Sequence, residues 1–564
     1  MLEVPTPEGS GTALFESWRL LDAFMRARLG WPPGPVAVRA HASGAALAFA
    51  APEDQLYAAT EVNEWAWLRA LEEAGREVPR GFAPGHPATW DVGSAQATLA
   101  ALAAAEARPA LMGLLEEARR RDLPVLLDDA ALSLGAGRGH RAWPMEALPA
   151  PESVPWAGLH AIPTALVTGS NGKTTSVRLL AAMGAAHGWK VGHTCTDGIY
   201  VGGELLEAGD FSGPGGARAV LRDARVEAAI LETARGGLLR RGLAVQRADV
   251  ALVTNVSPDH FGEYGIHTLA DLADAKLVVA RALGPTGLLV LNADDPVLAA
   301  RGEALPGHLG WFSLDAGHPR LVAHRSGGGA TCGLREGRFI LHGQGVEHDL
   351  GEGVAMPLAV GGRAAYNLAN IAGAALAAAG LGIPPAIIAA VLATFGAARS
   401  DNPGRLELWR FGGITVFMDY AHNPEGLEGL MKVAVAARGN GRLGLLLGQA
   451  GNREDSAIRA LAATAAGFGP DLVVLKDLAG YLRGRASGEV PALLRDELRL
   501  RGLPEARLRT VLPEVEAALA LFAWAKAGDV LVLPVHGVKA RHELSARLDR
   551  LDSRGWTTGD SVTP

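Results

Sequence analysis

The chain has 564 residues, of which 49% are hydrophobic and 20% charged, and its formal net charge at pH 7 is −7. This length predicts a globular protein of about three to four domains, and the negative charge gives no indication of general affinity for nucleic acid or acidic membranes. Two cysteines are too few for a disulfide framework and indicate a reducing compartment. The segment Met1–Gly11 has no apolar signal-peptide core, and no long uncharged apolar run indicates a membrane span. We therefore expect a cytoplasmic protein without nucleic-acid or membrane partners.

Residues 1–155 form the first predicted domain, an α/β unit without an evident catalytic cluster. Apolar residues recur at helical spacing near its start, and short apolar runs alternate with further helical stretches. We expect helices at Ala13–Leu29, Asn63–Glu73 and Ala95–Ala105, and strands at Val36–Val38, Ala45–Ala50 and Pro124–Leu127. The proline-rich segment Arg141–Pro163 is predicted to be a linker. A domain of this kind fits a role in substrate binding or oligomerisation, and a homo-oligomer is compatible with it.

Residues 156–402 form the second predicted domain, in which strands and helices alternate. Such alternation favours a mostly parallel sheet with helices on both faces. The expected strands are Ala165–Thr168, Ala228–Leu231, Val250–Val253 and Leu288–Leu291, and polar residues follow each of them. Because ligands of open α/β sheets collect beyond the carboxyl ends of the strands, we expect a binding site there. The stretch Gly328–Leu350 is predicted to be a small hairpin.

A phosphate-binding loop is predicted at Thr168–Thr175, whose sequence TGSNGKTT joins the first of these strands to a helix. Its glycines would let backbone N–H groups and the helix N-terminus approach a polyphosphate. In the usual G-x-x-x-x-G-K-[ST] pattern the lysine, here Lys173, bridges phosphates and the next hydroxyl, here Thr174, binds Mg²⁺. The loop is a variant, since Val167 replaces the first glycine. A Gly/Ser turn with a chance lysine is the other interpretation, which the strand–loop–helix order disfavours. The residues expected to hold the nucleotide phosphates are Gly169, Asn171, Gly172, Lys173, Thr174 and Thr175.

Polar side chains follow the other strands of this domain. Glu232 comes after the second strand, where a carboxylate suits Mg²⁺ shared with substrate phosphates. His260, after the third strand, could ligate a metal or hold a phosphate, although a lone histidine near a turn is more often structural. Lys276 lies in an apolar helical stretch, where a lysine ordinarily buries its stem and extends its charge to solvent. Asn292, after the fourth strand, could bind an adenine edge or a ribose, although its surroundings also indicate a turn.

Residues 403–564 form the third predicted domain, a second and smaller parallel α/β unit. Its expected strands are Ile414–Met418, Leu443–Leu447, Leu472–Leu475 and Val530–Pro534, and its expected helices are Ser456–Ala466, Gly488–Leu500 and Glu514–Ala525. The first of these strands leads directly into the motif DYAHNP at Asp419–Pro424.

These motifs resemble those of the Mur ligase superfamily, the ATP-dependent amide-forming ligases that include peptidoglycan stem-peptide enzymes and folylpolyglutamate synthase. The resemblance runs from about Thr164 to the C-terminus. Thr196–Tyr200 (TDGIY), Glu232–Leu243 (ETARGGLLRRGL) and Leu482–Val490 (LRGRASGEV) look most like the Mur-type half of cyanophycin synthetase, which adds arginine to an aspartate side-chain carboxylate. The resemblance implies a three-domain, Mur-ligase-like α/β architecture. A central P-loop parallel sheet would bind ATP, a C-terminal Rossmann-like domain would bind the incoming amino acid, and an N-terminal α/β domain would precede them.

The resemblance also implies a metal site. Lys173 and Thr174 would hold the ATP phosphates and Mg²⁺, and Glu232 and His260 would complete metal binding. Lys276 matches the family lysine that is carbamylated, a modification that turns a cation into a carboxylate able to help bind a second Mg²⁺.

Other positions would contact the nucleotide. The resemblance implies that Asn292 meets the adenine, and that Arg405, at the hinge into the last domain, closes over the nucleotide with Asp419. One departure occurs at Tyr366-Asn367, where many relatives have His-Asn, whereas Asn370 is retained.

Cyanophycin synthetase carries an ATP-grasp domain between its N-terminal domain and its Mur-type half, and this chain has no room for one. The resemblance therefore implies a protein that lacks one of two active sites. We expect an ADP-forming ligase that joins an amino acid to a carboxylate or peptide through an acyl phosphate. One alternative is a peptidoglycan-type or folylpolyglutamate-type ligase. Another is an inactive nucleotide-binding scaffold, which predicts decay among Glu232, His260 and Lys276, whereas all three are present.

Overall fold

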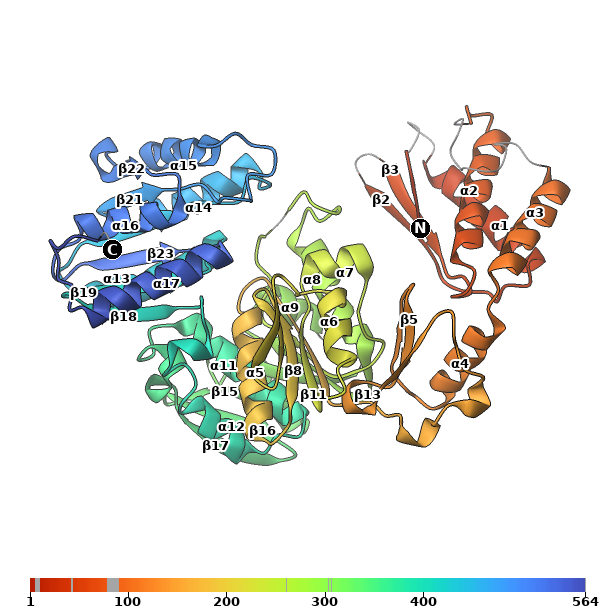
Figure 1. Ribbon diagram of the computed structural model, residues 1–564, viewed down its shortest axis with the longest axis horizontal. Helices are drawn as coiled ribbons and strands as arrows, with labels where there is room; N and C mark the ends of the chain where they lie inside the picture. The colour runs from red at the N-terminus through yellow and green to blue at the C-terminus, as the bar shows by residue number, and fades with distance from the viewer. Residues whose placement is uncertain are drawn as a thin grey trace. The chain divides into compact units, whose positions relative to one another are not determined.

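The computed structural model describes residues 1–5, 11–41, 44–78, 91–259, 261–302, 304–305 and 307–562. Its contacts divide the chain into two compact α/β units (Figure 1). Unit 1 comprises Met1–Leu132 and Trp143–Gly158, and unit 2 comprises Ser133–Ala142 and Leu159–Pro564. Because this division leaves unit 2 whole, the boundary expected near residue 402 stays a prediction.

Unit 1 consists of helices packed on a small antiparallel sheet, in which β3 lies between β1 and β2. Its elements are β1 (Leu2–Val4), α1 (Gly11–Arg28), β2 (Val36–His41), β3 (Gly44–Phe49), α2 (Leu56–Glu73), α3 (Val92–Glu106) and α4 (Pro109–Arg120). The core contains Trp18 from α1 and Trp65 and Trp67 from α2, each at most 2% exposed. The helices and strands predicted here are confirmed. Helix α4 was not predicted, although Pro109 at its first turn and its buried leucines at helical spacing were a usable signal.

A small three-stranded sheet follows α4 in the chain. Its strands are β4 (Val125–Leu127), β5 (Ala131–Leu134) and β6 (Arg141–Pro144), in the order β4-β5-β6. The segment Arg141–Pro163, predicted to be a linker, thus begins with a strand and continues through single 3₁₀ turns at Pro151–Ser153 and Trp156–Gly158.

The first part of unit 2, called the central segment here (residues 159–402), is built on an eleven-stranded mixed sheet of order β10-β9-β8-β11-β7-β12-β13-β14-β15-β16-β17. The strands are β7 (Thr164–Thr168), β8 (Val191–Cys195), β9 (Gly198–Val201), β10 (Glu204–Ala208), β11 (Ala228–Glu232), β12 (Ala248–Val253), β13 (Leu283–Asn292), β14 (His308–Ser313), β15 (Ala330–Arg335), β16 (Arg338–Gly343) and β17 (Val346–Glu352). The α-helices are α5 (Lys173–Ala186), α6 (Pro214–Leu221), α7 (Arg235–Arg241), α8 (Leu269–Leu277), α9 (Pro296–Gly302), α10 (Pro319–Ser326), α11 (Ala365–Gly380) and α12 (Pro385–Leu392).

The middle of this sheet, with the strand order β8-β11-β7-β12-β13-β14-β15, is parallel, as predicted, whereas both edges are antiparallel. The hairpin expected at Gly328–Leu350 is a meander of β15, β16 and β17, which continues the main sheet. Antiparallel additions of this kind need only short turns, so they extend the sheet without further crossover helices.

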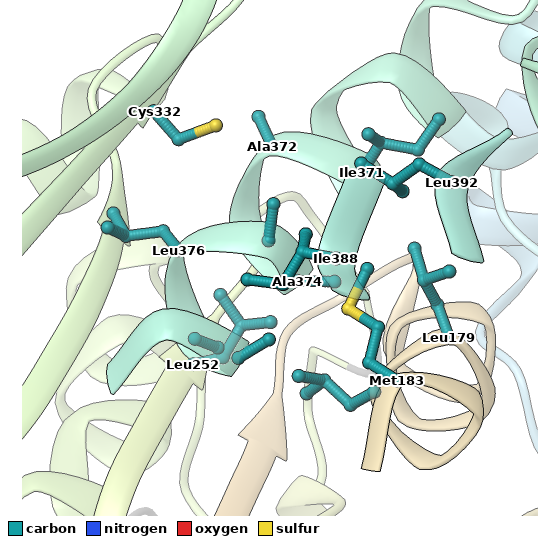
Figure 2. Close-up of a cluster of buried hydrophobic side chains, with 14 of the residues drawn as sticks. Leu179, Met183, Leu252, Cys332, Ile371, Ala372, Ala374, Leu376, Ile388 and Leu392 are labelled. Atoms are coloured by element: carbon teal, nitrogen blue, oxygen red, sulfur yellow. The ribbon is translucent and has the colours of Figure 1, made fainter. Parts of the chain in front are cut away.

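The core of the central segment lies between the sheet and helices α5, α11 and α12 (Figure 2). Figure 2 shows Leu179 and Met183 of α5 facing the side chains of α11 and α12, with Leu252 of β12 beneath them. In β7, Ala165 and Val167 belong to this cluster, and Leu166, which points to the opposite face, is only 2% exposed. Both faces of the central strands are therefore buried, as expected for a parallel sheet.

The second part of unit 2, called the C-terminal segment here (residues 403–562), has a six-stranded sheet of order β18-β19-β23-β20-β21-β22. Its strands are β18 (Glu407–Phe411), β19 (Ile414–Asp419), β20 (Leu443–Leu447), β21 (Leu472–Leu475), β22 (Leu508–Thr510) and β23 (Val530–Pro534), and its helices are α13 (Pro424–Arg438), α14 (Asp455–Gly467), α15 (Glu489–Leu500), α16 (Glu514–Trp524) and α17 (Val538–Ser553). Only β18 is antiparallel to its neighbour. Apolar clusters cover both faces of the sheet, and the predicted strands and helices are confirmed.

Among the described residues, no single helix is both long and apolar enough to cross a membrane, although α3 and α4, bent by 71° to each other, pass that test of length and composition as a pair.

A buried ion pair in unit 1 couples its stability to pH. The Arg26 guanidinium donates to Asp22 Oδ2 at 2.9 Å within α1 and lies 5.1 Å from the centre of the Phe49 ring. Asp22 is fully buried, and burial raises the pKa of its carboxyl to about 6, although the charge of Arg26 opposes this shift.

We expect the free energy of unfolding of unit 1 to rise by up to about 3 kcal/mol as the pH falls from 7 to 4, because the folded unit binds a proton at Asp22 more tightly than the unfolded chain does. This contribution is lost again as the pH rises through 6. Hydrogen exchange of the α1 amides, corrected for intrinsic rates, should show increasing protection toward pH 4. Asp22→Asn should flatten that dependence and Glu16→Gln, at an exposed position on the same helix, should preserve it. An equal slope in all three proteins would contradict the assignment.

Candidate functional site

The site begins with the register of three parallel strands at the centre of the sheet. Strand β11 pairs with β7 so that Glu232 lies opposite Val167, and β12 pairs on the other side with Val253 opposite Thr168. The carboxyl ends of the three strands therefore meet at one edge, and the polar residues that follow them are brought together.

The loop between β7 and α5 has the conformation of a phosphate cradle. Gly172 has φ +83° at the helix N-cap, and a Cβ there would lie 2.1 Å from Asn370 Oδ1. Gly169 has φ +150°, and a Cβ there would lie 1.8 Å from Thr254 Oγ1. Only glycine fits these two positions, because any side chain would meet both backbone strain and a neighbouring atom. The missing first glycine at Val167 has no such consequence, since Val167 is a core residue of β7.

Residues after β12 hold this loop in place. Asn255 Oδ1 accepts from the Asn171 N–H at 2.8 Å, and Thr254 Oγ1 donates to the Asn171 carbonyl at 2.6 Å. Ser170 Oγ and Ser257 exchange hydrogen bonds of 3.0 and 3.1 Å. The loop is thus fixed by its neighbours before any ligand binds.

Lys173, Thr174 and Glu232 lie together at the start of α5. Thr174 Oγ1 donates to Glu232 Oε2 at 2.8 Å, and Thr196 Oγ1, from the β8–β9 turn, donates to Glu232 Oε1 at 3.2 Å. Lys173 Nζ donates to the carbonyls of Gly169 and Ser170, both at 3.0 Å. Glu232 is 2% exposed, and burial raises the pKa of its carboxyl while the charge of Lys173 opposes this.

The hinge between the two segments of unit 2 reaches this cluster. Arg405 Nη2 donates to Thr174 Oγ1 at 3.2 Å, and the Arg405 guanidinium lies 4.5 Å from the centre of the Tyr420 ring. Asp419 fixes the turn behind Arg405, because its carboxylate accepts from the N–H groups of Leu406 and Ala421, each at 2.7 Å. Leu406 is held at φ +53°, an unusual conformation for leucine.

Asp197 joins the central segment to the C-terminal segment electrostatically. Its carboxylate pairs with Arg178 of α5 at 2.8 Å and with Arg541 of α17, and Arg405 lies 3.7 Å away. Burial opposes ionisation of Asp197, but the charges of Arg405, Arg541 and Arg178 outweigh burial and lower its pKa to about 2. Three cations from three chain regions thus depend on one carboxylate.

A cavity of about 140 Å³ lies at the centre of these residues. The loop residues 170–175, Thr196 and Glu232 line one side, and Arg405, Asp419–His422 and Glu425 line the other. Asn171 Nδ2 donates to Glu425 Oε2 at 2.8 Å across it. Tyr366, Asn367 and Asn370 of α11 complete the wall. Most of the residues predicted from the sequence therefore surround one cavity, to which both segments contribute.

Three predicted residues of the described chain, Gly169, Lys276 and Asn292, do not line the cavity, although Gly169 belongs to the loop. Asn292 does not line the cavity: its amide donates to the Thr254 carbonyl at 3.1 Å and accepts from the Asp294 N–H at 3.0 Å. Lys276 is 4% exposed on α8, where burial and the charge of Lys173 hold its pKa well below the usual value although Asp259 opposes them. His260 lies outside the described residues.

Several residues at the site were not predicted. Thr196 contacts Glu232, and Asn370 lines the cavity; their motifs had been noted in the sequence but given no contact in the site. Asp259 pairs with Arg453 at 3.0 Å and lies 3.7 Å from His422 Nε2, which extends the polar surface beyond Lys276 into the C-terminal segment. The contacts of Asp259 with His422 and Arg453 join residues more than 160 positions apart, so no local signal could reveal them.

Comparisons with known proteins agree with this arrangement. Residues 167–378 match the Mur ligase middle domain, and residues 404–534 match the Mur ligase, glutamate ligase domain. The chain is 37% identical over 374 residues to cyanophycin synthetase of Trichormus variabilis, a match that covers 66% of this chain and 41% of that protein. The chain spans less than half the length of the cyanophycin synthetases that it matches in T. variabilis and Crocosphaera subtropica.

A second relative is similar over nearly its whole length. UDP-N-acetylmuramate–L-alanine ligase of Kineococcus radiotolerans is 30% identical over 472 residues, which cover 82% of this chain and 84% of that protein. Among solved structures, E. coli FolC in complex with ADP, without folate substrate, matches with a TM-score of 0.49 and 20% identity, covering 69% of this chain and 90% of that one. The two domain matches and the extent of the K. radiotolerans match establish that the chain belongs to the Mur ligase family.

Proposed function

We propose that the chain is an ATP-dependent, ADP-forming ligase that joins a carboxylate to the amine of an amino acid or peptide. The observation that carries the proposal is the single cavity in which Lys173, Thr174 and Glu232 of the central segment face Arg405 and Asp419 of the C-terminal segment. Family membership supports the same class of reaction, because the relatives described above are a synthetase and a ligase.

The loop would hold the nucleotide phosphates. Backbone N–H groups of residues 170–173 stand at the N-terminus of α5, where the helix dipole favours negative charge. Lys173 Nζ, now bound to two loop carbonyls, would turn to the phosphate oxygens and stabilise the transferring phosphoryl group. Arg405 would neutralise further phosphate charge, and the Asp419 carboxylate would accept a hydrogen bond from a ribose hydroxyl.

The base would lie against α11. The amide of Asn292, our first candidate, bonds to Thr254 and Asp294 and does not line the cavity. Asn370 lines the cavity and approaches Gly172, although its Nδ2 donates to Asn367 Oδ1 at 3.2 Å. We therefore favour Asn370 as the amide that contacts the adenine. A cavity of about 140 Å³ is below the about 300–1,000 Å³ of ordinary ligand sites, so nucleotide entry requires the two segments to separate and close again.

The oxygen atoms at the start of α5 fit Mg²⁺. Thr174 Oγ1, Thr196 Oγ1 and Glu232 lie within 3.2 Å of one another, and all are hard donors of the kind that Mg²⁺ prefers. No group of three or more His, Cys, Asp or Glu side chains suited to a metal occurs among the described residues. Mg²⁺ commonly keeps waters and substrate phosphates as ligands, so two or three protein oxygen atoms are enough to hold it. When bound, Mg²⁺ would neutralise charge on the transferring phosphoryl group.

Lys276 would serve the same site in a modified form. Its depressed pKa favours the neutral amine, the form that reacts with carbon dioxide to give a carbamate. That modification would remove a buried cation near Lys173 and add a carboxylate for a second Mg²⁺, with His260 as the other expected ligand.

In the proposed reaction a substrate carboxylate attacks the γ-phosphorus of ATP, and ADP leaves as the acyl phosphate forms. The amine then attacks the acyl carbon, phosphate leaves, and the surplus proton of the amine passes to solvent or a nearby base. Closure of the segments would protect the acyl phosphate from water. The surface formed by Asp259, His422 and Arg453, at the edge of the C-terminal segment, would present charged groups to the incoming amino acid.

A peptidoglycan-type reaction is the second candidate, because the match with UDP-N-acetylmuramate–L-alanine ligase covers 82% of this chain. Phosphate release from ATP, measured with paired substrates, separates the two. Stimulation by UDP-N-acetylmuramate with L-alanine would favour this second candidate. Stimulation by an aspartate-containing peptide with arginine would favour the cyanophycin-synthetase-like reaction, and ATP binding with no stimulation across all amino acids and dicarboxylates would indicate a scaffold.

Lys173→Ala should lower the rate of substrate-stimulated phosphate release by about 100-fold or more, because no other described side chain occupies its place at the loop. Lys432→Ala, which removes an exposed lysine paired with Glu428 on α13, is the matched control and should leave the rate unchanged. Retention of the full rate by Lys173→Ala would exclude the proposed role.

Gly172→Ala should weaken ADP binding by at least about 10-fold, because its Cβ would both strain the backbone and displace Asn370. Gly203→Ala is the control for strain alone, since Gly203 also has a positive φ, +88°, with nothing within 4 Å of its Cβ position. Isothermal titration with ADP measures both variants. Equal loss of affinity in the two would show that strain, not the contact with Asn370, is responsible.

A further inference from the structure

A second and larger cavity lies on the other side of Arg405 from the proposed nucleotide site. It measures about 980 Å³ and is formed wholly within unit 2. The β8–β10 region and the segment before α11 form one wall, and the hinge, β18 and α17 form the other. Arg405 and Leu406 line both cavities, so the two are neighbours. We call it the hinge cavity.

The hinge cavity carries an excess of positive charge, although the whole chain has a net charge of −7. Six arginines and His542 line it, against only three acidic side chains, Asp197, Glu407 and Asp549. The arginines are Arg178, Arg363, Arg399, Arg405, Arg410 and Arg541. With histidine neutral, the lining charge is +3, the six arginines less the three acids.

The three acids are already engaged. Asp197 pairs with Arg178 and Arg541, and Asp549 pairs with Arg399 and accepts from Trp409 Nε1 at 2.8 Å. Glu407 accepts from the Gly404 N–H and from Ser545.

Two of the arginines remain available for a ligand. Within the described part of the chain, the guanidinium groups of Arg363 and Arg410 have neither an ion pair nor a hydrogen bond, and both side chains are exposed. Each presents five N–H donors that match the oxygen atoms of a carboxylate or phosphate.

The remaining lining indicates an organic ligand rather than an inorganic ion. Tyr200, Leu205, Pro357, Val360 and Leu408 contribute apolar surface between the cationic groups. A volume near the upper end of the about 300–1,000 Å³ range for ligand sites suits a molecule of oligopeptide size.

We propose that the hinge cavity is a binding site for an acidic, peptide-like ligand with two or more carboxylates, separate from the nucleotide site. One carboxylate would pair with Arg363 in the central segment and another with Arg410 in the C-terminal segment.

A ligand that bridges these two arginines favours the closed arrangement of the segments. In that arrangement Arg405 reaches Thr174 of the phosphate loop. Binding in the hinge cavity and binding of nucleotide therefore strengthen each other, because each stabilises the state that the other needs.

Fluorescently labelled triaspartate is a direct probe of this site, and fluorescence anisotropy with the full-length protein measures its binding. Arg363→Gln/Arg410→Gln should weaken triaspartate binding by about 10- to 100-fold, since two charge-assisted contacts are removed. Arg281→Gln/Arg509→Gln, which changes one exposed arginine in each segment outside the cavity, should leave binding unchanged. Equal binding by the wild type and both double variants would overturn the proposal.

Two further arms identify the ligand class and the coupling. Unlabelled tripolyphosphate and unlabelled triaspartate are each used to displace the labelled probe. If tripolyphosphate does so at the lower concentration, the cavity binds phosphates and the choice of carboxylates is overturned. Saturating triaspartate should raise the affinity for ADP in the wild type but not in Arg363→Gln/Arg410→Gln, and an unchanged ADP affinity in the wild type would overturn the coupling. Both double variants should bind ADP normally without triaspartate, which confirms that they are folded.

Discussion

The parallel pairing of β7 with β11 and β12 is the constraint on which the rest of the site depends. Parallel strands end at the same edge of a sheet, so the pairing of β7, β11 and β12 alone brings together the residues that follow them. No contact between their side chains is needed for this. Glu232 is buried as a result, and its burial is tolerated because Thr174 and Thr196 donate to its oxygen atoms. A slip of one residue in β11 would turn Glu232 to the opposite face of the sheet and separate it from the loop.

Ion pairs of Asp197 connect the central segment to the hinge and the C-terminal segment. Asp197 belongs to the central segment, and its arginine partners come from α5, the hinge and α17. A nearly buried carboxylate beside three arginines is stable only while all of them stay close, because separation would leave charges without partners in a poorly solvated place. The same contacts hold Arg405 between the two cavities, with Tyr420 against its guanidinium. Closure of the segments and placement of Arg405 are thus one event.

The local parts of this molecule could be predicted from the sequence, and the parts that join distant residues could not. Strands such as Val250–Val253 and helices such as Glu514–Ala525 follow from apolar periodicity, and the phosphate loop follows from its glycines. Two kinds of feature were not predicted. Antiparallel edge strands such as β18 have no periodicity that distinguishes them from parallel ones. The hydrogen bond from the Asn292 amide to the Thr254 carbonyl has no local signal, because Thr254 lies 38 positions away, directly after the neighbouring strand β12.

The phosphate loop also shows how a closed site can be stable and still accept a nucleotide. Lys173 is bound to the carbonyls of Gly169 and Ser170, and Arg405 to Thr174, so the cations that would face phosphates are satisfied by protein atoms. Polyphosphate oxygens could replace these carbonyl and hydroxyl acceptors at similar distances. The exchange would be favourable, because a charged acceptor forms stronger hydrogen bonds than a neutral one. The backbone of the loop is meanwhile held by Thr254 and Asn255, which do not depend on the ligand. Under the proposed function, nucleotide binding would require the two cationic side chains and the hinge to move but would leave the cradle itself unchanged, so little of the binding energy would be lost in reorganising the loop.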